Sequence, residues 1–138
     1  MGVTLVHRLF GFDGRVGRLG YLLFTVLYLV IAALPAGAGV LVSVPDSYLS
    51  ILSGFALAAV IGAWGCLALT TQRLHDLGYS GLHTVWIAGL AIVAAWLDDR
   101  HPGLSMVVIA GLALLALGMV LVPGEKDLNR FGAPRRRI

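Results

Sequence analysis

The sequence predicts an all-α integral membrane protein with four transmembrane helices. Hydrophobic residues make up 59% of the chain and charged residues only 12%, against about 25% charged in an ordinary soluble domain. Four uncharged runs cover 19–45, 47–72, 77–97 and 104–122. Each run reaches the roughly 20 residues that a helix needs to cross a bilayer core of about 30 Å. Four spans within 138 residues leave room for a single domain, 1–138.

The first span is expected at about 19–42. Arg15 and Arg18 precede it as the basic part of a signal peptide would, but the apolar run is longer than the 7 to 15 residues of a signal core, so we interpret it as a retained helix. Pro35 interrupts the run, which predicts either a kink or an early end of the helix. Before this span, residues 3–10 are expected to form a short helix lying in the membrane interface.

The second span is expected at about 49–71 and carries small side chains at every fourth position. Lipid gives helices no hydrophobic reason to associate, so small residues matter because they let two backbones approach closely. The partner of this stripe is either another helix of the same chain or a second copy. The stripe consists of Gly54, Ala58, Gly62 and Cys66.

The third and fourth spans are expected at about 81–97 and 104–122, followed by a basic tail, 123–138. Placing successive loops on alternate sides of the membrane puts nine of the ten Lys and Arg residues on one side and only Arg100 on the other. Because basic loops stay in the cytoplasm, this asymmetry predicts that both termini are cytoplasmic. The nine are Arg8, Arg15, Arg18, Arg73, Lys126, Arg130, Arg135, Arg136 and Arg137.

Three polar motifs fall on this cytoplasmic side: FDGRVGR at 12–18, TQRLHDLGYSG at 71–81 and PGEKDLNRFGAP at 123–134. In their order, and in their positions relative to four spans, they resemble the YhaH-like bacterial inner-membrane proteins, domain of unknown function family number eight hundred and five. The resemblance covers nearly the whole chain. It implies a four-helix protein of the bacterial inner membrane and supplies no established reaction.

The central motif predicts a polar cluster at the membrane surface. Arg73 and Asp76 are three residues apart, on one face if the second helix continues that far. Gly78 suits a left-handed helix cap and Ser80 suits the N-cap of the third span, whose free N–H groups would favour an anion. The residues expected to converge are Arg15, Arg18, Arg73, His75, Asp76, Ser80, Asn129 and Arg130.

Two functions fit such a cluster. Converging arginines can bind an anionic lipid headgroup or a small anion by paired N–H donation, in lipid or solute handling. Alternatively, the motifs only fix orientation and tie the loops together, and the protein is a structural or assembly subunit of a membrane complex. The expected partners are anionic membrane lipids, with a second copy or another membrane protein as further candidates. We expect no nucleic acid partner, because the basic pI of about 9.5 follows from membrane topology.

The sequence offers less support for an enzyme activity than for binding or assembly, and it leaves that question open. His75, Asp76 and Ser80 are the residue types of a hydrolytic triad, but no nucleophile elbow or His-Glu-x-x-His pattern accompanies them. The four histidines are scattered and the one cysteine has no partner, so we expect neither a metal site nor a cofactor.

Overall fold

The computed structural model describes residues 10–43 and 48–133, and these fold into four α-helices with no strand among them. The expected all-helical fold is confirmed. The interfacial helix expected at 3–10 lies outside the described residues except for Phe10. The helices are α2 (Arg18–Leu41), α3 (Leu49–Asp76), α4 (His83–Asp98) and α5 (Pro102–Leu121).

Three of these helices, α2, α3 and α5, are long and apolar enough to cross a membrane, and α4 is a shorter apolar helix of 16 residues. At a rise of about 1.5 Å per residue, α4 is roughly 24 Å long, somewhat less than a bilayer core. Large apolar side chains remain exposed along all four helices. The protein is therefore a membrane protein whose outer surface suits lipid.

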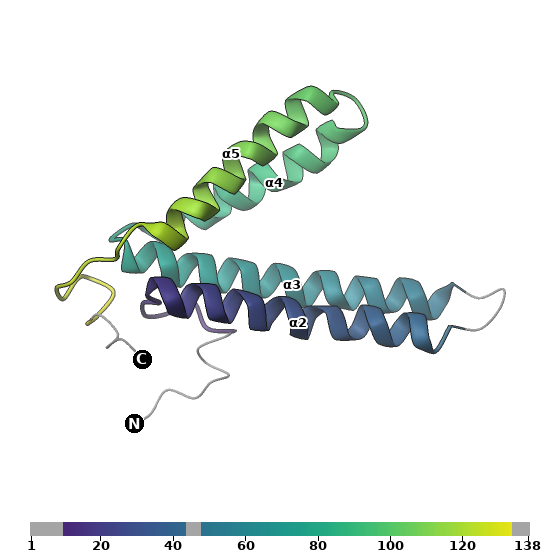
Figure 1. The fold of residues 1–138 in the computed structure, drawn as a ribbon, viewed down its shortest axis with the longest axis horizontal. Helices are drawn as coiled ribbons and strands as arrows, with labels where there is room; N and C mark the ends of the chain where they lie inside the picture. The colour runs from purple at the N-terminus through teal and green to yellow at the C-terminus, as the bar shows by residue number, and fades with distance from the viewer. Residues whose placement is uncertain (1–9, 44–47, 134–138) are drawn as a thin grey trace.

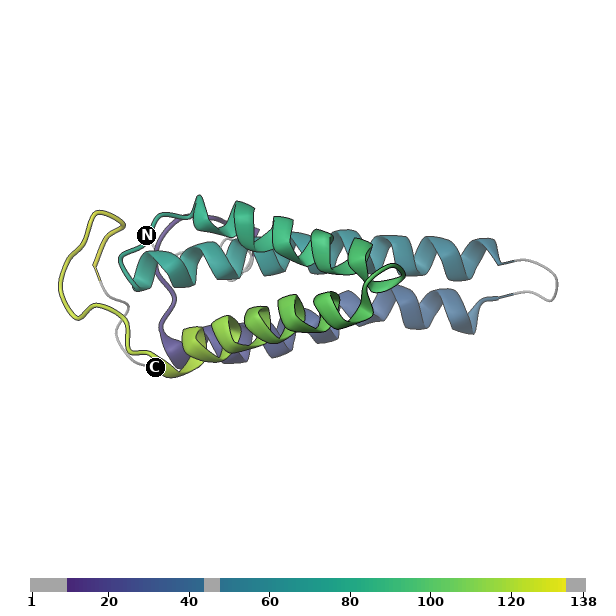
Figure 2. The ribbon, with the colours of Figure 1, turned by 90° about the horizontal axis from the view of Figure 1, so that it is seen from above.

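The helices pair into two antiparallel hairpins, α2 with α3 and α4 with α5. The two hairpins meet at one end and diverge toward the other, so that they form a V (Figure 1). Seen from above, α4 lies over α3 and α5 over α2 (Figure 2). The closed end of the V holds both the start of α2 and the end of α5, together with the segment before α2 and the segment after α5.

Glycines allow the close approach of α2 and α3. A side chain at Gly54 would overlap the carbonyl oxygen of Pro35, and one at Gly39 would overlap the carbonyl oxygen of Ser50. α2 does not end early at Pro35 but continues to Leu41. Proline is tolerated inside a membrane helix because neighbouring groups and local adjustments can satisfy the backbone that it frees. Nearer the closed end, the Tyr28 ring packs directly over Gly65.

The turn between the hairpins follows a left-handed glycine. Gly78 has φ of +82°, as its sequence position predicts, and the Tyr79 N–H donates to the Leu74 carbonyl at 2.9 Å. Ser80 is not the N-cap of α4, because α4 begins two residues later than expected, with Leu82 as its cap. The hydroxyl of Ser80 instead accepts the Leu82 N–H at 3.3 Å, inside the turn.

Candidate functional site: a buried arginine clasp

The second long helix, α3, extends through Asp76, past the expected span end at residue 71, and its last two turns are buried although they are polar. Arg73 is 0% exposed and Asp76 is 5% exposed. The two side chains form the expected ion pair three residues apart, through Nη1 of Arg73 and Oδ2 of Asp76. This pair lies inside the protein, under the chain segments that close the V.

Arg73 uses four of the five N–H donors of a guanidinium on acceptors of the protein. Nε donates to the Met119 carbonyl at 2.7 Å, and Nη2 donates to the carbonyl of Val122. Nη1 donates to the Val16 carbonyl at 3.3 Å in addition to Asp76. One α3 side chain therefore binds the end of α5 and the segment that leads into α2.

Arg15 approaches the same carboxylate from the first motif, and it is 1% exposed. Its Nε donates to Oδ1 of Asp76 at 3.1 Å. The other donors reach the segment after α5: Nη1 donates to the carbonyls of Asp127 at 2.8 Å and Gly132 at 3.2 Å, and Nη2 donates to that of Glu125. Arg15 thus also has four of its five N–H groups occupied.

We call Arg15, Arg73 and Asp76 the arginine clasp. Each oxygen of the single carboxylate accepts from a different guanidinium, and backbone carbonyls take the remaining bonds described above. A buried charge is strongly unfavourable unless it is paired and fully hydrogen-bonded. The clasp meets this requirement, and it joins three stretches of chain that are more than forty residues apart.

The segment after α5 is shaped to fit against Asp76. A side chain at Gly124 would overlap the Asp76 carboxylate, and the next N–H, that of Glu125, donates to the Asp76 carbonyl at 2.8 Å. Glycine is therefore required at position 124 for the backbone to approach so closely. The carboxylate of Glu125 in turn lies over Gly78, where a side chain would collide with it.

His75 and Asn129 hold the rest of this segment. Asn129 donates to the His75 carbonyl at 3.0 Å and to Oε2 of Glu125 at 2.7 Å, and its own oxygen accepts the Phe131 N–H at 2.9 Å. The ring of Phe131 stacks on the His75 imidazole with centroids 3.8 Å apart. His75 Nδ1 also lies 3.2 Å from the Gly14 carbonyl. Through Gly14 and Phe131, this residue of the central motif therefore contacts both of the other polar motifs.

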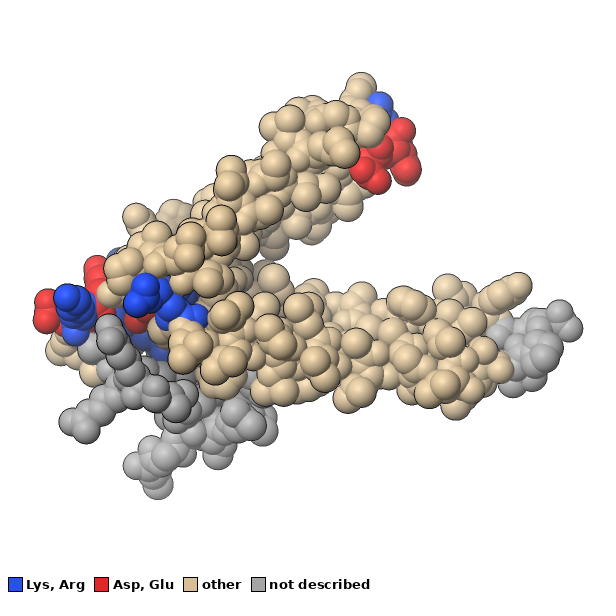
Figure 3. Space-filling view, viewed as in Figure 1, with Lys and Arg blue, Asp and Glu red and all other residues tan. Residues whose placement is uncertain are grey.

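Arg18 and Arg130 lie at the same end of the protein but outside the clasp, and both are exposed. Among the described residues, Arg18 has one hydrogen bond, from Nη1 to the Leu121 carbonyl at 3.3 Å. Arg130 reaches the Gly78 carbonyl at 3.4 Å and lies over the Phe131 ring. Figure 3 shows basic and acidic side chains gathered at the closed end of the V, with a smaller charged group at the tip of the α4–α5 hairpin.

The N-terminus of α4 offers few free donors. The N–H groups of His83, Thr84 and Val85 already donate to the carbonyls three residues before them, at 2.9 to 3.1 Å. Four N–H donors of each buried arginine are also occupied. Arg73 and the N-terminus of α4 therefore do not form an open anion site. The cations that face outward are those outside the clasp.

Comparison with known families agrees with this architecture. The model of the family described as "Protein of unknown function (DUF805)" matches residues 9–133, which include all the described parts of the three polar motifs. The chain is a member of the DUF805 family. It matches no curated protein and no solved structure.

In this DUF805 chain, the structure adds contacts of polar residues beside the clasp that sequence reasoning did not predict. Gln72 is 0% exposed and donates to the Gly11 carbonyl, while the Val16 N–H donates to the Gln72 carbonyl at 3.2 Å. The hydroxyls of Thr71 and Thr84 lie 2.9 Å apart and join α3 to α4. The signal was a run of three polar residues, 70–72, at the end of an otherwise apolar helix.

The small-residue stripe of α3 has a different course from the one expected. Gly54 is buried against α2, Ala58 is half-buried, and Gly62 lies within ordinary contact distance of Ala32, 3.7 Å from its Cβ. Cys66 is exposed, and Gly65 takes its place in the seam. A strict four-residue step drifts around a helix that has 3.6 residues per turn, so a seam must include a step of three.

Proposed function

We propose that this membrane protein binds anionic phospholipid headgroups at the closed end of the V, through the exposed cations Arg18, Lys126 and Arg130. The observation that carries the proposal is the division between two kinds of arginine. Arg15 and Arg73 are buried and occupied, whereas Arg18 is exposed with one hydrogen bond among the described residues. An exposed guanidinium at the end of an apolar helix matches the depth of lipid phosphates.

The other residues of the site then have supporting roles. The arginine clasp, His75 and Asn129 fix the segments that carry Lys126 and Arg130, and Ser80 shapes the turn into α4. The basic residues Arg135, Arg136 and Arg137 lie in the sequence just after the described segment and would add to the attraction. A basic residue near an anionic membrane surface contributes about 1 kcal/mol.

The proposal is tested by native mass spectrometry of protein extracted from vesicles that contain phosphatidylglycerol and phosphatidylcholine in equal amounts. We expect wild type to retain phosphatidylglycerol preferentially. The double variant Arg18→Ala, Arg130→Ala loses two cations, about 2 kcal/mol, and should retain roughly 30-fold less. Arg100→Ala, which removes the cation at the opposite tip, is the matched control. Equal retention in all three proteins would refute the proposal.

A second candidate is a structural or assembly subunit with no ligand of its own. It is favoured by the arginine clasp, which satisfies its charges inside one chain and so needs no ligand to be stable. In that case the same spectra would contain no lipid adduct, and the protein would be found bound to a second copy or to another membrane protein.

Orientation is part of the proposal. We place the closed end and both termini in the cytoplasm of a bacterial cell, with the protein in the inner membrane, because the basic residues gather there. In a Cys66→Ala background, a cysteine at position 98, replacing Asp98, should react with an impermeant reagent added outside the cell. One replacing Arg136 should react only after permeabilisation, and the reverse pattern would invert the topology.

A further inference from the structure

The space between the two hairpins is a wedge, closed at the polar end and open at the other (Figure 3). Its sides belong to apolar helices, along which large apolar side chains remain exposed. In a bilayer such a wedge must be filled, because an empty apolar gap loses the contacts of its lining.

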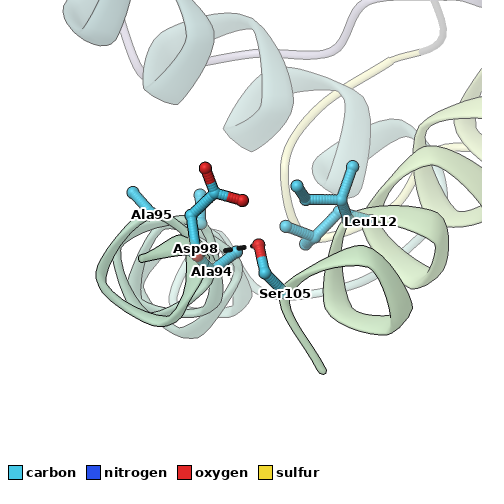
Figure 4. Close-up of a pocket in the computed structure, with 7 residues that line it drawn as sticks. Ala94, Ala95, Asp98, Ser105 and Leu112 are labelled. Atoms are coloured by element: carbon cyan, nitrogen blue, oxygen red, sulfur yellow. Dashed lines mark hydrogen bonds between the residues drawn. The ribbon is translucent and has the colours of Figure 1, made fainter. Parts of the chain in front are cut away.

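A pocket of about 380 Å³ opens on the α4–α5 side of this wedge. Small side chains of α4, among them Ala91 and Ala95, form one wall, and Ile109 and Leu112 of α5 form the other. Figure 4 shows Asp98 and Leu112 on the side of the hairpin that faces the other pair of helices. The polar residues of its lining are Asp98 and Ser105, and the Ser105 hydroxyl is occupied, since it donates to the Ala94 carbonyl at 3.0 Å.

We infer that this wedge seats one phospholipid, with its phosphate at Arg18 and its acyl chains running between the hairpins to the pocket. The inference rests on the proposed function and names the place where the bound lipid lies. Arg18 joins α2 to the end of α5 at the closed end of the wedge, so its positive charge is placed at one end of two apolar walls. A phospholipid has the complementary arrangement, an anionic head on flexible apolar chains.

The dimensions agree with this occupant. Ile109 is twelve residues before Leu121, or about 18 Å along α5, close to half of a bilayer core of about 30 Å. An acyl chain that begins at a phosphate beside Arg18 therefore reaches the pocket. A helix of a second copy is about 10 Å across and rigid, so it cannot fill a wedge down to its closed end. Acyl chains can follow the taper.

The test fills the pocket from an exposed position. Ala95→Trp places a large side chain in the pocket, while Val93→Trp adds the same bulk on the opposite face of α4. Ala91→Leu is a milder filling variant in case the tryptophan prevents folding, which circular dichroism and gel filtration would show. Each protein is extracted from the equal mixture of phosphatidylglycerol and phosphatidylcholine, and retained lipid is weighed by native mass spectrometry.

We expect wild type and Val93→Trp to retain one phosphatidylglycerol each, and Ala95→Trp or Ala91→Leu to retain at least tenfold less. If the double variant Arg18→Ala, Arg130→Ala lowers retention while the filling variants do not, the headgroup proposal stands and the wedge is wrong. If wild type retains both lipids equally and the filling variants remove them, the wedge stands without the charge preference. A dimer that Ala95→Trp dissociates, with no lipid retained, would overturn the inference in favour of a second copy.

Discussion

At the closed end of the V, two guanidinium groups, one carboxylate and six backbone carbonyls hold three stretches of chain together. At the open end, the α2–α3 hairpin is held by close backbone contact at Gly39 and Gly54, and nothing polar joins it to the other hairpin among the described residues. Hydrogen bonds in a low dielectric fix the first region, and van der Waals contact fixes the second. The difference explains why the two hairpins meet at one end only.

The largest effect is expected from Asp76→Ala. Removing the only carboxylate of the clasp leaves Arg15 and Arg73 buried without a counter-charge, which should destabilise the fold by about 3 to 5 kcal/mol. The measurement is the unfolding midpoint in detergent, followed by circular dichroism. Asp127→Ala is the control, because Asp127 is exposed and only its backbone carbonyl bonds to Arg15. Similar midpoints for the two variants would mean that the arginine clasp contributes little to the stability of the fold.

The contact between α2 and α3 is probed by Gly65→Ala. The new methyl group would overlap the Tyr28 ring, and such overpacking should destabilise the protein by about 1 to 3 kcal/mol. Gly111→Ala in α5 is the matched control, since open space surrounds that glycine and alanine favours a helix. The unfolding midpoint of Gly65→Ala should be lower than that of wild type, and the midpoint of Gly111→Ala should be slightly higher. An unchanged midpoint for Gly65→Ala would show that α2 and α3 can move apart at Gly65 without loss of stability.

A smaller and local effect is expected from Asn129→Ala. The side chain makes one hydrogen bond to the His75 carbonyl of α3 and two within the segment after α5, so its loss should loosen that segment by about 1 to 2 kcal/mol. Hydrogen exchange of the Phe131 and Glu125 amides should accelerate while the amides of α3 keep their protection. Lys126→Ala, an exposed position of the same segment, should leave both rates unchanged. If the amides of α3 also exchanged faster, the contacts of Asn129 would contribute to the stability of the whole protein and not only to that of this segment.

The smallest effect is expected from Cys66→Val. Because Cys66 is exposed outside the helix seam, the substitution should change stability by no more than about 0.5 kcal/mol. Gly54→Ala, only three helical turns away, should be clearly destabilising, since its methyl group would overlap the Pro35 carbonyl. The unfolding midpoints of the two variants together show which residues lie in the contact between α2 and α3. If Cys66→Val lowered the midpoint as much as Gly54→Ala, Cys66 would lie in that contact, as the sequence predicted.

The sequence predicted the membrane fold and the ion pair of Arg73 with Asp76 because both depend on local spacing. Long apolar runs can only be spanning helices, and residues three apart on a helix must be neighbours. It also predicted the left-handed Gly78. The burial of Arg15 could not be predicted in this way, because Arg15 is 61 residues from Asp76 and 110 from Glu125 along the chain. Cytoplasmic orientation and lipid binding stay predictions.

The sequence by itself determined that the described residues form apolar helices and which three motifs carry the polar groups. Composition and local spacing suffice for this, since lipid forces every apolar run to satisfy its backbone within a helix. Only the tertiary structure decided which arginines are structural and which face outward. That choice depends on backbone carbonyls at Met119, Val122 and Asp127, which become acceptors for Arg15 and Arg73 only when the end of α5 is brought against α3.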